Sequence, residues 1–278
     1  MPRLLVLWDV DHTLVNAGGA GIQLYRIAFA EMFGGEMPVP GSMAGRTERA
    51  IVLEVLTLAG VPEPRSKIAA FHAVMTAHAP EVADLIRERG VALPGAAEAL
   101  AAVAAAGTGG AGAVGAGAGG AGAGSAGAGS AGVGGVAAGN GGAGWDEHCA
   151  RPVVQALLTG NIRPLAEVKL RALGLTEHLD LDVGTYGDAH EVRSELVGPA
   201  RRRAALAYGA DFSGEATVLV GDTPLDVEAA LVTGARAVAV ATGYYSVAEL
   251  TAAGAHAVLP DLNDTGRVLA AILPQPGG

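Results

Sequence analysis

The stretch LLVLWDVDHTL, residues 4–14, decides the fold of this chain. Residues 4–8 are mostly apolar and lead directly into Asp9 and Asp11. A short apolar run that ends in turn-forming polar residues is typical of a buried parallel strand, and ligands bind beyond the carboxyl ends of such strands. Two carboxylates at this spacing repel each other unless a cation or a shared proton intervenes. The stretch therefore predicts either a metal site, most simply for magnesium, or a pair of ordinary turn residues.

The composition restricts the class of protein before any other motif is considered. The chain has 278 residues, a formal net charge of −10 and one cysteine, Cys149. The negative charge argues against nucleic acid or an anionic membrane surface as the main partner. Residues 4–8 are too short for the apolar core of a signal peptide, and no strongly apolar run reaches membrane-spanning length. These features predict a cytoplasmic protein with a reduced cysteine, and they leave its oligomeric state open.

Residues 17–93 have the periodicity of helices. Apolar side chains from Ile22 to Met32 recur at spacings of three and four residues, which is the pattern of an amphipathic helix. Three further segments with helical faces follow before residue 90. We therefore expect a helical cap over residues 17–93, inserted between the two parts of one core, residues 1–16 and 94–278.

The turn GSMAGRT, residues 41–47, carries the candidate cap residue Arg46. A guanidinium group on a loop can contact an anionic substrate. A solvent-exposed arginine without such a role is equally compatible with the sequence.

A glycine- and alanine-rich segment interrupts the core. Residues 94–104 predict a helix that returns to the core, and residues 105–145 then consist mostly of Gly, Ala and Ser. Such a composition lacks the side chains to bury a core, so we expect a flexible low-complexity insertion. Because it enters the next strand from the amino end, the insertion should project away from groups at the carboxyl ends. Trp145, His148 and Cys149 beyond it indicate a return to ordered structure or a metal site.

The stretch VVQALLTGN, residues 153–161, repeats the pattern of an apolar strand with a polar end. Thr159, Gly160 and Asn161 follow the apolar residues, and a hydroxyl group with free backbone amides at a strand end can hold phosphate oxygens. The alternative is a strand-to-helix turn in which Thr159 or Asn161 caps the helix. A helix is expected over residues 164–174.

Two basic residues downstream are candidate phosphate contacts. Lys169 lies between apolar positions of the expected helix, and Arg193 lies in a loop after a short strand predicted over residues 179–183. Either cation can neutralise a phosphoryl group, although Lys169 on a solvated helix face is also consistent with the pattern.

The stretch ATVLVGDTPLDVEAA, residues 216–230, gives a further strand end with acidic residues. Asp222 follows the apolar run, and Asp226 lies in a helix whose first turn contains a proline, which suits that position. The two aspartates are placed to bind the same cation. With later strands at residues 237–241 and 257–259, the sequence predicts an α/β fold: a Rossmann-like parallel sheet core with an inserted α-helical cap and a Gly/Ala-rich insertion.

The order of these motifs resembles that of a known family. DVDHTL, LLTGN, a downstream Lys or Arg, and GDTPLD occur in the order seen in the haloacid dehalogenase superfamily of phosphohydrolases. The chain is similar to phosphoglycolate-phosphatase-like members with a helical cap, over residues 3–98 and 152–273. The resemblance implies that Asp9 is the nucleophile, which forms an aspartyl-phosphate, and that Asp11 is the general acid and then the base for water.

The resemblance also implies roles for the other strand ends. Thr159 and the neighbouring amides would bind phosphoryl oxygens. Asp9, the backbone carbonyl of Asp11, and Asp222 would hold Mg²⁺, with Asp226 assisting.

Two positions depart from the usual family pattern. Many relatives carry the phosphoryl-neutralising lysine near the loop of Arg193, whereas relatives with the TGN motif place it in the following helix, which favours Lys169 over Arg193. His12 stands where glycine is usual, so it either changes the first loop or contacts the cap.

The sequence therefore predicts a Mg²⁺-dependent phosphomonoester hydrolase that acts on a small phosphorylated, phosphoglycolate-like metabolite. A phosphomutase of the same fold would share all four motifs. A non-enzymatic interaction protein that uses its glycine-rich segment is a second alternative. A haloacid dehalogenase is disfavoured, because it has no need for the metal-binding pair Asp11 and Asp222.

Overall fold

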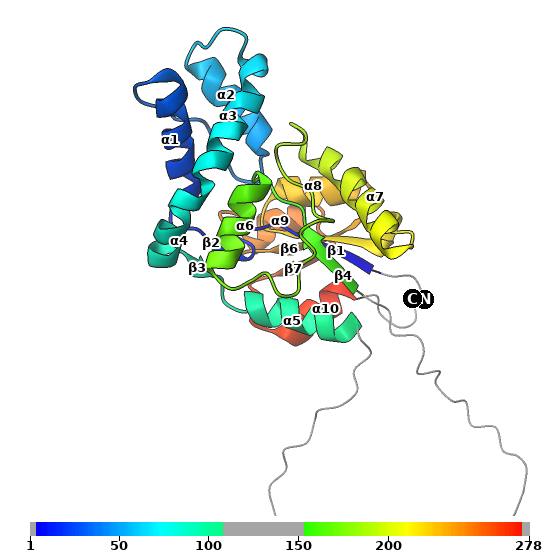
Figure 1. Ribbon diagram of the computed structural model, residues 1–278. Helices are drawn as coiled ribbons and strands as arrows, with labels where there is room; N and C mark the ends of the chain where they lie inside the picture. Colours follow the sequence, from blue (N-terminus) through cyan, green and yellow to red (C-terminus); the bar gives the residue numbers. More distant parts are fainter. Residues whose placement is uncertain (1–3, 108–152, 274–278) are drawn as a thin grey trace, which may run out of the picture.

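The computed structural model describes residues 4–107 and 153–273 and contains one parallel sheet of five strands (Figure 1). The strand order is β4-β1-β5-β6-β7. The strands are β1 (Leu4–Trp8), β4 (Val153–Leu157), β5 (Thr217–Gly221), β6 (Arg236–Val240) and β7 (Ala257–Leu259).

Strand β1 lies in the interior of this sheet, between β4 and β5, and its sequence is apolar on both faces. All five of its residues are buried. Trp8, its last residue, pairs in parallel with Leu157 of β4 and Val220 of β5. The carboxyl ends of the three strands therefore meet at one edge of the sheet, where Asp9 follows β1.

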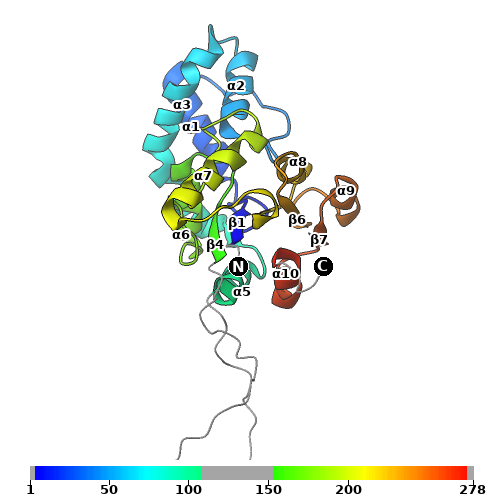
Figure 2. The same cartoon turned by 90° about the vertical axis from the view of Figure 1, so that its right-hand side faces the viewer.

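Helices cover both faces of the sheet and complete a three-layered core (Figures 1 and 2). Side chains of Val6 and Trp8 pack with α5 and α10, and those of Leu5 and Leu7 pack with α7, α8 and α9. These helices are α5 (Ala96–Gly107), α7 (Val197–Tyr208), α8 (Pro224–Val232), α9 (Val247–Ala252) and α10 (Thr265–Ile272), with short 3-10 turns η2 (Arg193–Leu196) and η3 (Gly214–Ala216). The predicted α/β fold is confirmed.

The cap is a separate helical layer with its own apolar core. Two short antiparallel strands, β2 (Val15–Asn16) and β3 (Val91–Ala92), carry the chain into the cap and back. Between them lie α1 (Ala20–Phe33), α2 (Glu48–Leu58), α3 (Pro64–His78), η1 (Ala79–Val82) and α4 (Ala83–Arg89). Helix α6 (Arg163–Ala172) of the core packs against the cap through Leu165 and through Ile162, which precedes it. Both views place this helix next to the cap (Figures 1 and 2).

One predicted element is wrong. Residues 179–183 form a loop with a turn at residues 181–183 rather than a strand, because the Asp180 carboxylate accepts hydrogen bonds from the backbone N–H groups of Asp182 and Val183. An aspartate that bonds to the backbone two and three residues ahead favours a turn over a strand. The pairing beside β4 is reduced to a single bridge between Leu158 and Thr185.

The predicted Gly/Ala-rich insertion lies outside the described residues except for its first three, which end α5. The two described residues that flank the gap are close together. A Cβ atom added to Gly107 would lie 2.6 Å from the backbone nitrogen of Val153. None of the helices in the described part of the chain is long and apolar enough to cross a membrane.

Candidate active site

A cavity of about 570 Å³ lies between the carboxyl ends of the strands and the cap. The core contributes the predicted residues Asp9, Asp11, Thr159 and Asp222 from the ends of β1, β4 and β5. Other residues that line it are Asn161, Lys169 and Arg193 from the core and Tyr25, Arg46 and Glu48 from the cap. The topology therefore brings together predicted residues that lie up to 213 positions apart in the sequence.

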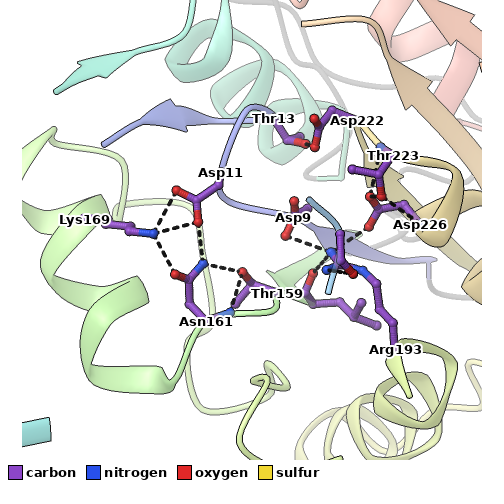
Figure 3. Close-up of polar contacts among 12 residues, drawn as sticks. Asp9, Asp11, Thr13, Thr159, Asn161, Lys169, Arg193, Asp222, Thr223 and Asp226 are labelled. Atoms are coloured by element: carbon purple, nitrogen blue, oxygen red, sulfur yellow. Dashed lines mark hydrogen bonds and ion pairs between the residues drawn. The ribbon is translucent and has the colours of Figure 1, made fainter. Parts of the chain in front are cut away.

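One group of charges surrounds Arg193, which is buried at the floor of the site (Figure 3). Its Nη2 lies 2.8 Å from Asp9 Oδ1 and 2.6 Å from Asp226 Oδ1. The guanidinium also donates to the backbone oxygens of Leu158 and Gly45. Arg193 thus joins two carboxylates of the core to a loop of the cap.

The carboxylates at this floor form a candidate metal site. Ligand atoms of Asp9, Asp222 and Asp226 all lie within 4.8 Å of one another, and the three residues are buried. Burial, followed by the charges of Asp9 and Asp226, raises the pKa of Asp222. Asp222 accepts a long hydrogen bond from Thr13, and its Oδ2 has no partner within the described residues. A buried carboxylate oxygen without a donor, among other carboxylates, suits a hard cation such as Mg²⁺.

Of the three carboxylates, Asp226 has the most ion-pair and hydrogen-bond partners. Besides its ion pair with Arg193, its Oδ2 accepts hydrogen bonds from the backbone N–H and the hydroxyl group of Thr223. This capping box starts helix α8. Asp9 and Asp222 are therefore the residues best placed to hold a metal, and Asp226 supports them.

A second group of charges surrounds Asp11. The Lys169 ammonium lies 2.8 and 2.6 Å from its two oxygens, and the side-chain amide of Asn161 donates to Oδ2 at 2.8 Å. Lys169 also donates to Asn161 Oδ1, and the Asn161 amide donates to Thr159 Oγ1 (Figure 3). The four residues form one connected polar network along the wall of the cavity.

The two predicted cations are thus divided between the two aspartates. Arg193 contacts Asp9, and Lys169 contacts Asp11. Both basic side chains are almost fully buried, which is rare unless such groups are paired. The sequence posed a choice between Lys169 and Arg193 as the phosphate contact, whereas in the structure each of the two pairs with its own aspartate.

Comparison with known proteins bears on the fold of the chain. A family model described as HAD-hydrolase-like matches residues 196–265. None of the curated protein sequences matches the chain.

Many solved structures match the chain, several of them over nearly its whole length. A predicted phosphatase from Clostridium acetobutylicum is 12% identical, with 97% of this chain and 100% of that chain covered and a TM-score of 0.58. CbbY from Rhodobacter sphaeroides, in complex with phosphate, is 18% identical, with 95% and 96% covered and a TM-score of 0.57. A provisionally assigned beta-phosphoglucomutase from Bacteroides vulgatus is 15% identical, with 99% and 91% covered and a TM-score of 0.55. The chain has the haloacid dehalogenase-like fold.

Within this haloacid dehalogenase-like fold, the predicted cap contact Arg46 is directed to its own cap. Its guanidinium forms an ion pair with Glu54 and donates to the backbone oxygen of Ser42. The backbone oxygen of Arg46 approaches Gly160 so closely that a Cβ atom there would lie 2.1 Å from it. Gly160 is therefore required for the fit of the cap loop against the end of β4.

His12 adopts a left-handed backbone conformation with φ of 59°, a region that glycine enters without a steric cost. Thr242 donates to its backbone oxygen, and its ring packs edge-on against Tyr244 at 5.0 Å between centroids. This ring contact lies within the core, since Tyr244 belongs to the loop after β6.

Several residues at the site are missing from the sequence prediction. Thr13 donates a hydrogen bond to Asp222. The signal in the sequence that could have indicated it is a hydroxyl residue four positions after Asp9. Glu48 and Tyr25 form a hydrogen-bonded pair in the cap wall. Glu48 follows Thr47, which caps helix α2, and an acidic residue in a first helical turn ordinarily indicates only favourable charge at the helix start.

Proposed function

We propose that this protein is a Mg²⁺-dependent phosphomonoesterase that acts through an aspartyl-phosphate on Asp9. The observation that carries the proposal is the group of buried carboxylates, Asp9, Asp222 and Asp226, beside the buried Arg193 at the floor of a cavity. A cavity of about 570 Å³ has room for a small phosphorylated metabolite of the size of phosphoglycolate.

The first step is attack by Asp9 on phosphorus. Arg193 holds Asp9 Oδ1, so Oδ2 is the oxygen that forms the new P–O bond. The bond from phosphorus to the leaving alkoxide breaks, and Asp11 gives a proton to that alkoxide. Arg193 and the Thr159 end of β4 stabilise the charge on the phosphoryl oxygens during the transfer.

The second step returns Asp9 to its starting state. Asp11, now ionised, accepts a proton from water, and the resulting hydroxide attacks phosphorus and releases Asp9 and inorganic phosphate. The ion pair with Lys169 favours the ionised form of Asp11 that this step needs. In the first step, the anionic phosphoryl group competes for the Lys169 ammonium, which lets Asp11 take up the proton that it later donates.

Asp9, Asp222 and the backbone carbonyl of Asp11 would hold the Mg²⁺ ion, with Asp226 behind them. Bound Mg²⁺ supplies positive charge that lets an anionic carboxylate approach an anionic phosphate ester. The unpartnered Oδ2 of Asp222 supports this assignment.

A phosphomutase is the second candidate, and the fold likeness to the provisionally assigned beta-phosphoglucomutase favours keeping it. It would form the same phospho-aspartate but return the phosphoryl group to a second hydroxyl of the sugar. Phosphate released to solvent in excess of the enzyme distinguishes the hydrolase from the mutase.

The deciding experiment measures phosphate release from a panel of small phosphate esters, with Mg²⁺ and with a chelator. Release that requires Mg²⁺ is the expected result. Mg²⁺ should also raise the melting temperature of the wild-type protein but not of Asp222→Asn, which loses a charged ligand. No release from any ester, or equal release with chelator, would overturn the proposal.

A further inference from the structure

The cap wall of the cavity contains a buried acid that the proposed reaction does not use. Glu48 is the first residue of α2, lines the cavity and is 4% exposed. Its backbone N–H donates to the Gly160 oxygen at 2.7 Å, which fixes the start of the helix over the phosphate-binding end of β4. Its side chain therefore belongs to the cap but lies at the boundary with the core.

Glu48 differs from the other carboxylates of the cavity in its partners. Asp9 is paired with Arg193, and Asp11 is paired with Lys169. Across the described residues, no basic side chain lies within ion-pair distance of Glu48, and its one side-chain hydrogen bond comes from the hydroxyl group of Tyr25.

A buried carboxyl group without an ion pair is costly for the folded protein, although the nearby Lys169 charge offsets part of the cost for Glu48. Burial raises the pKa of Glu48 to about 7, because the charged form is poorly solvated there. A group kept at such a cost, and facing a cavity, indicates a binding role more often than a stabilising one. A hydrogen-bond donor on the cavity side would offset this cost.

The surroundings of Glu48 restrict what that donor can be. The cap part of the lining is otherwise largely apolar and includes Ile22, Met43 and Ile51 besides Tyr25. Arg46, the cation of this wall, is paired with Glu54. A carboxylate or second phosphate on the substrate would therefore approach the acid of this wall without an uncommitted cation to receive it.

We propose that Glu48 is a specificity residue that accepts a hydrogen bond from a hydroxyl or ammonium group on the leaving group of the substrate. The substrate class is then a phosphorylated alcohol or amino alcohol rather than a carboxylated ester such as phosphoglycolate. The inference rests on the proposed phosphatase function and narrows its substrate.

The test compares phosphate esters of matched size that differ at one end. The set is 2-hydroxyethyl, 2-aminoethyl, ethyl and carboxymethyl phosphate, each also with one more methylene group so that the end group can reach Glu48. For the wild-type protein we expect kcat/KM for the hydroxyl or ammonium ester to exceed that for the alkyl ester by about tenfold or more, with the carboxylated ester lowest.

Glu48→Gln should reduce the preference for the ammonium ester at least about tenfold and leave kcat/KM for the alkyl ester within about threefold. Glu48→Asp, which keeps the charge, should restore part of the preference. Glu36→Gln is the control, because it removes one negative charge from an exposed cap position. Circular dichroism checks that each variant is folded.

The outcomes separate the inference from the function on which it rests. Magnesium-dependent release with the carboxylated ester as the best substrate, or a ranking that Glu48→Gln leaves unchanged, overturns the inference alone. Absence of release from every ester overturns the proposed function and the inference with it.

Discussion

Asp9 and Asp11 lie two residues apart at the end of one strand, yet their surroundings are opposite. Asp9 is buried, and this burial raises its pKa even though Arg193 partly lowers it. Burial also acts to raise the pKa of Asp11, but the Lys169 charge and the hydrogen bonds from Lys169 and Asn161 lower it below its usual value. Two carboxylates with different settings can take different chemical roles.

The difference originates in which part of the fold supplies the cation. Arg193 comes from the turn before α7 and reaches the floor, where it also contacts the cap loop at Gly45. Lys169 comes from α6, on which the cap rests, and it contacts the wall. The ion pair of Arg193 with Asp9 at the floor suits a nucleophile that is held in place. The ion pair of Lys169 with Asp11 at the wall suits a group that exchanges a proton.

The largest expected effect comes from removing the floor carboxylate. Asp9→Asn keeps the shape of the side chain but removes the nucleophile, so we expect phosphate release to fall by about a thousandfold or more. The measurement is steady-state phosphate release with Mg²⁺, together with a thermal melt of both proteins.

Asp11→Asn is the matched comparison for Asp9→Asn. It should also lower turnover, and a phosphorylated protein should accumulate if the second step is slowed more than the first. If Asp9→Asn releases phosphate at the wild-type rate, Asp9 is not the nucleophile, and the assignment of floor and wall fails.

The next effect separates the two cations. Lys169→Met removes the charge beside Asp11, so the pKa of Asp11 should rise and the alkaline limb of kcat/KM should move to higher pH. We also expect the maximum of kcat/KM to fall by about 10- to 100-fold. An alkaline limb that stays at the same pH would mean that Asp11 is not the acid of the reaction.

Arg193→Met should differ from Lys169→Met in its effect on stability. Arg193 is bonded to Asp9, Asp226 and two backbone oxygens, so its removal leaves two buried carboxylates without their cation. The free energy of unfolding should fall by about 3–5 kcal/mol. Urea denaturation measures this free energy of unfolding. An equal loss in Arg193→Met and Lys169→Met would mean that the ion pairs at the floor stabilise the fold no more than the ion pair at the wall.

The strand ends were predictable from the sequence, because each is marked locally by an apolar run and a polar residue. This held for β1, β4 and β5 and for the proline-started helix α8. The partnerships of the cations were not predictable, because Lys169 and Asp11 are 158 residues apart and meet only through sheet order and cap packing. Local patterns also failed at residues 179–183, where one aspartate side chain favours a turn.

A smaller effect is expected for Glu48, the buried acid on the cap side of the cavity. It concerns the stability of the protein and how that stability depends on pH. Its pKa is about 7 in the folded protein and should be near the ordinary 4.5 when unfolded. Because the folded form holds its proton more tightly, this contribution to stability is fully present below pH 4.5 and is lost as the pH rises through 7. The cost reached above pH 7 is on the order of 3 kcal/mol.

Glu48→Gln has no such proton, so its stability relative to wild type should increase between pH 5 and pH 8. Urea denaturation of both proteins at the two pH values gives this double difference, and Glu36→Gln should show none. A difference of zero for Glu48→Gln would mean that Glu48 is ionised without cost in the folded protein.

The smallest expected effect concerns the opposite edge of the sheet. The glycine- and alanine-rich segment leaves the described structure at Gly107 and returns at Val153, which lie next to each other at the amino end of β4. The proposed catalytic groups lie at the carboxyl ends of the strands. Replacing residues 109–150 by a short Gly-Ser turn should therefore leave kcat/KM within about twofold and the pH profile unchanged. Because the two flanking residues are already adjacent, the short turn imposes little strain on α5 or β4. A folded shortened protein with a large loss of turnover would show that the segment acts on the site across the full length of the sheet.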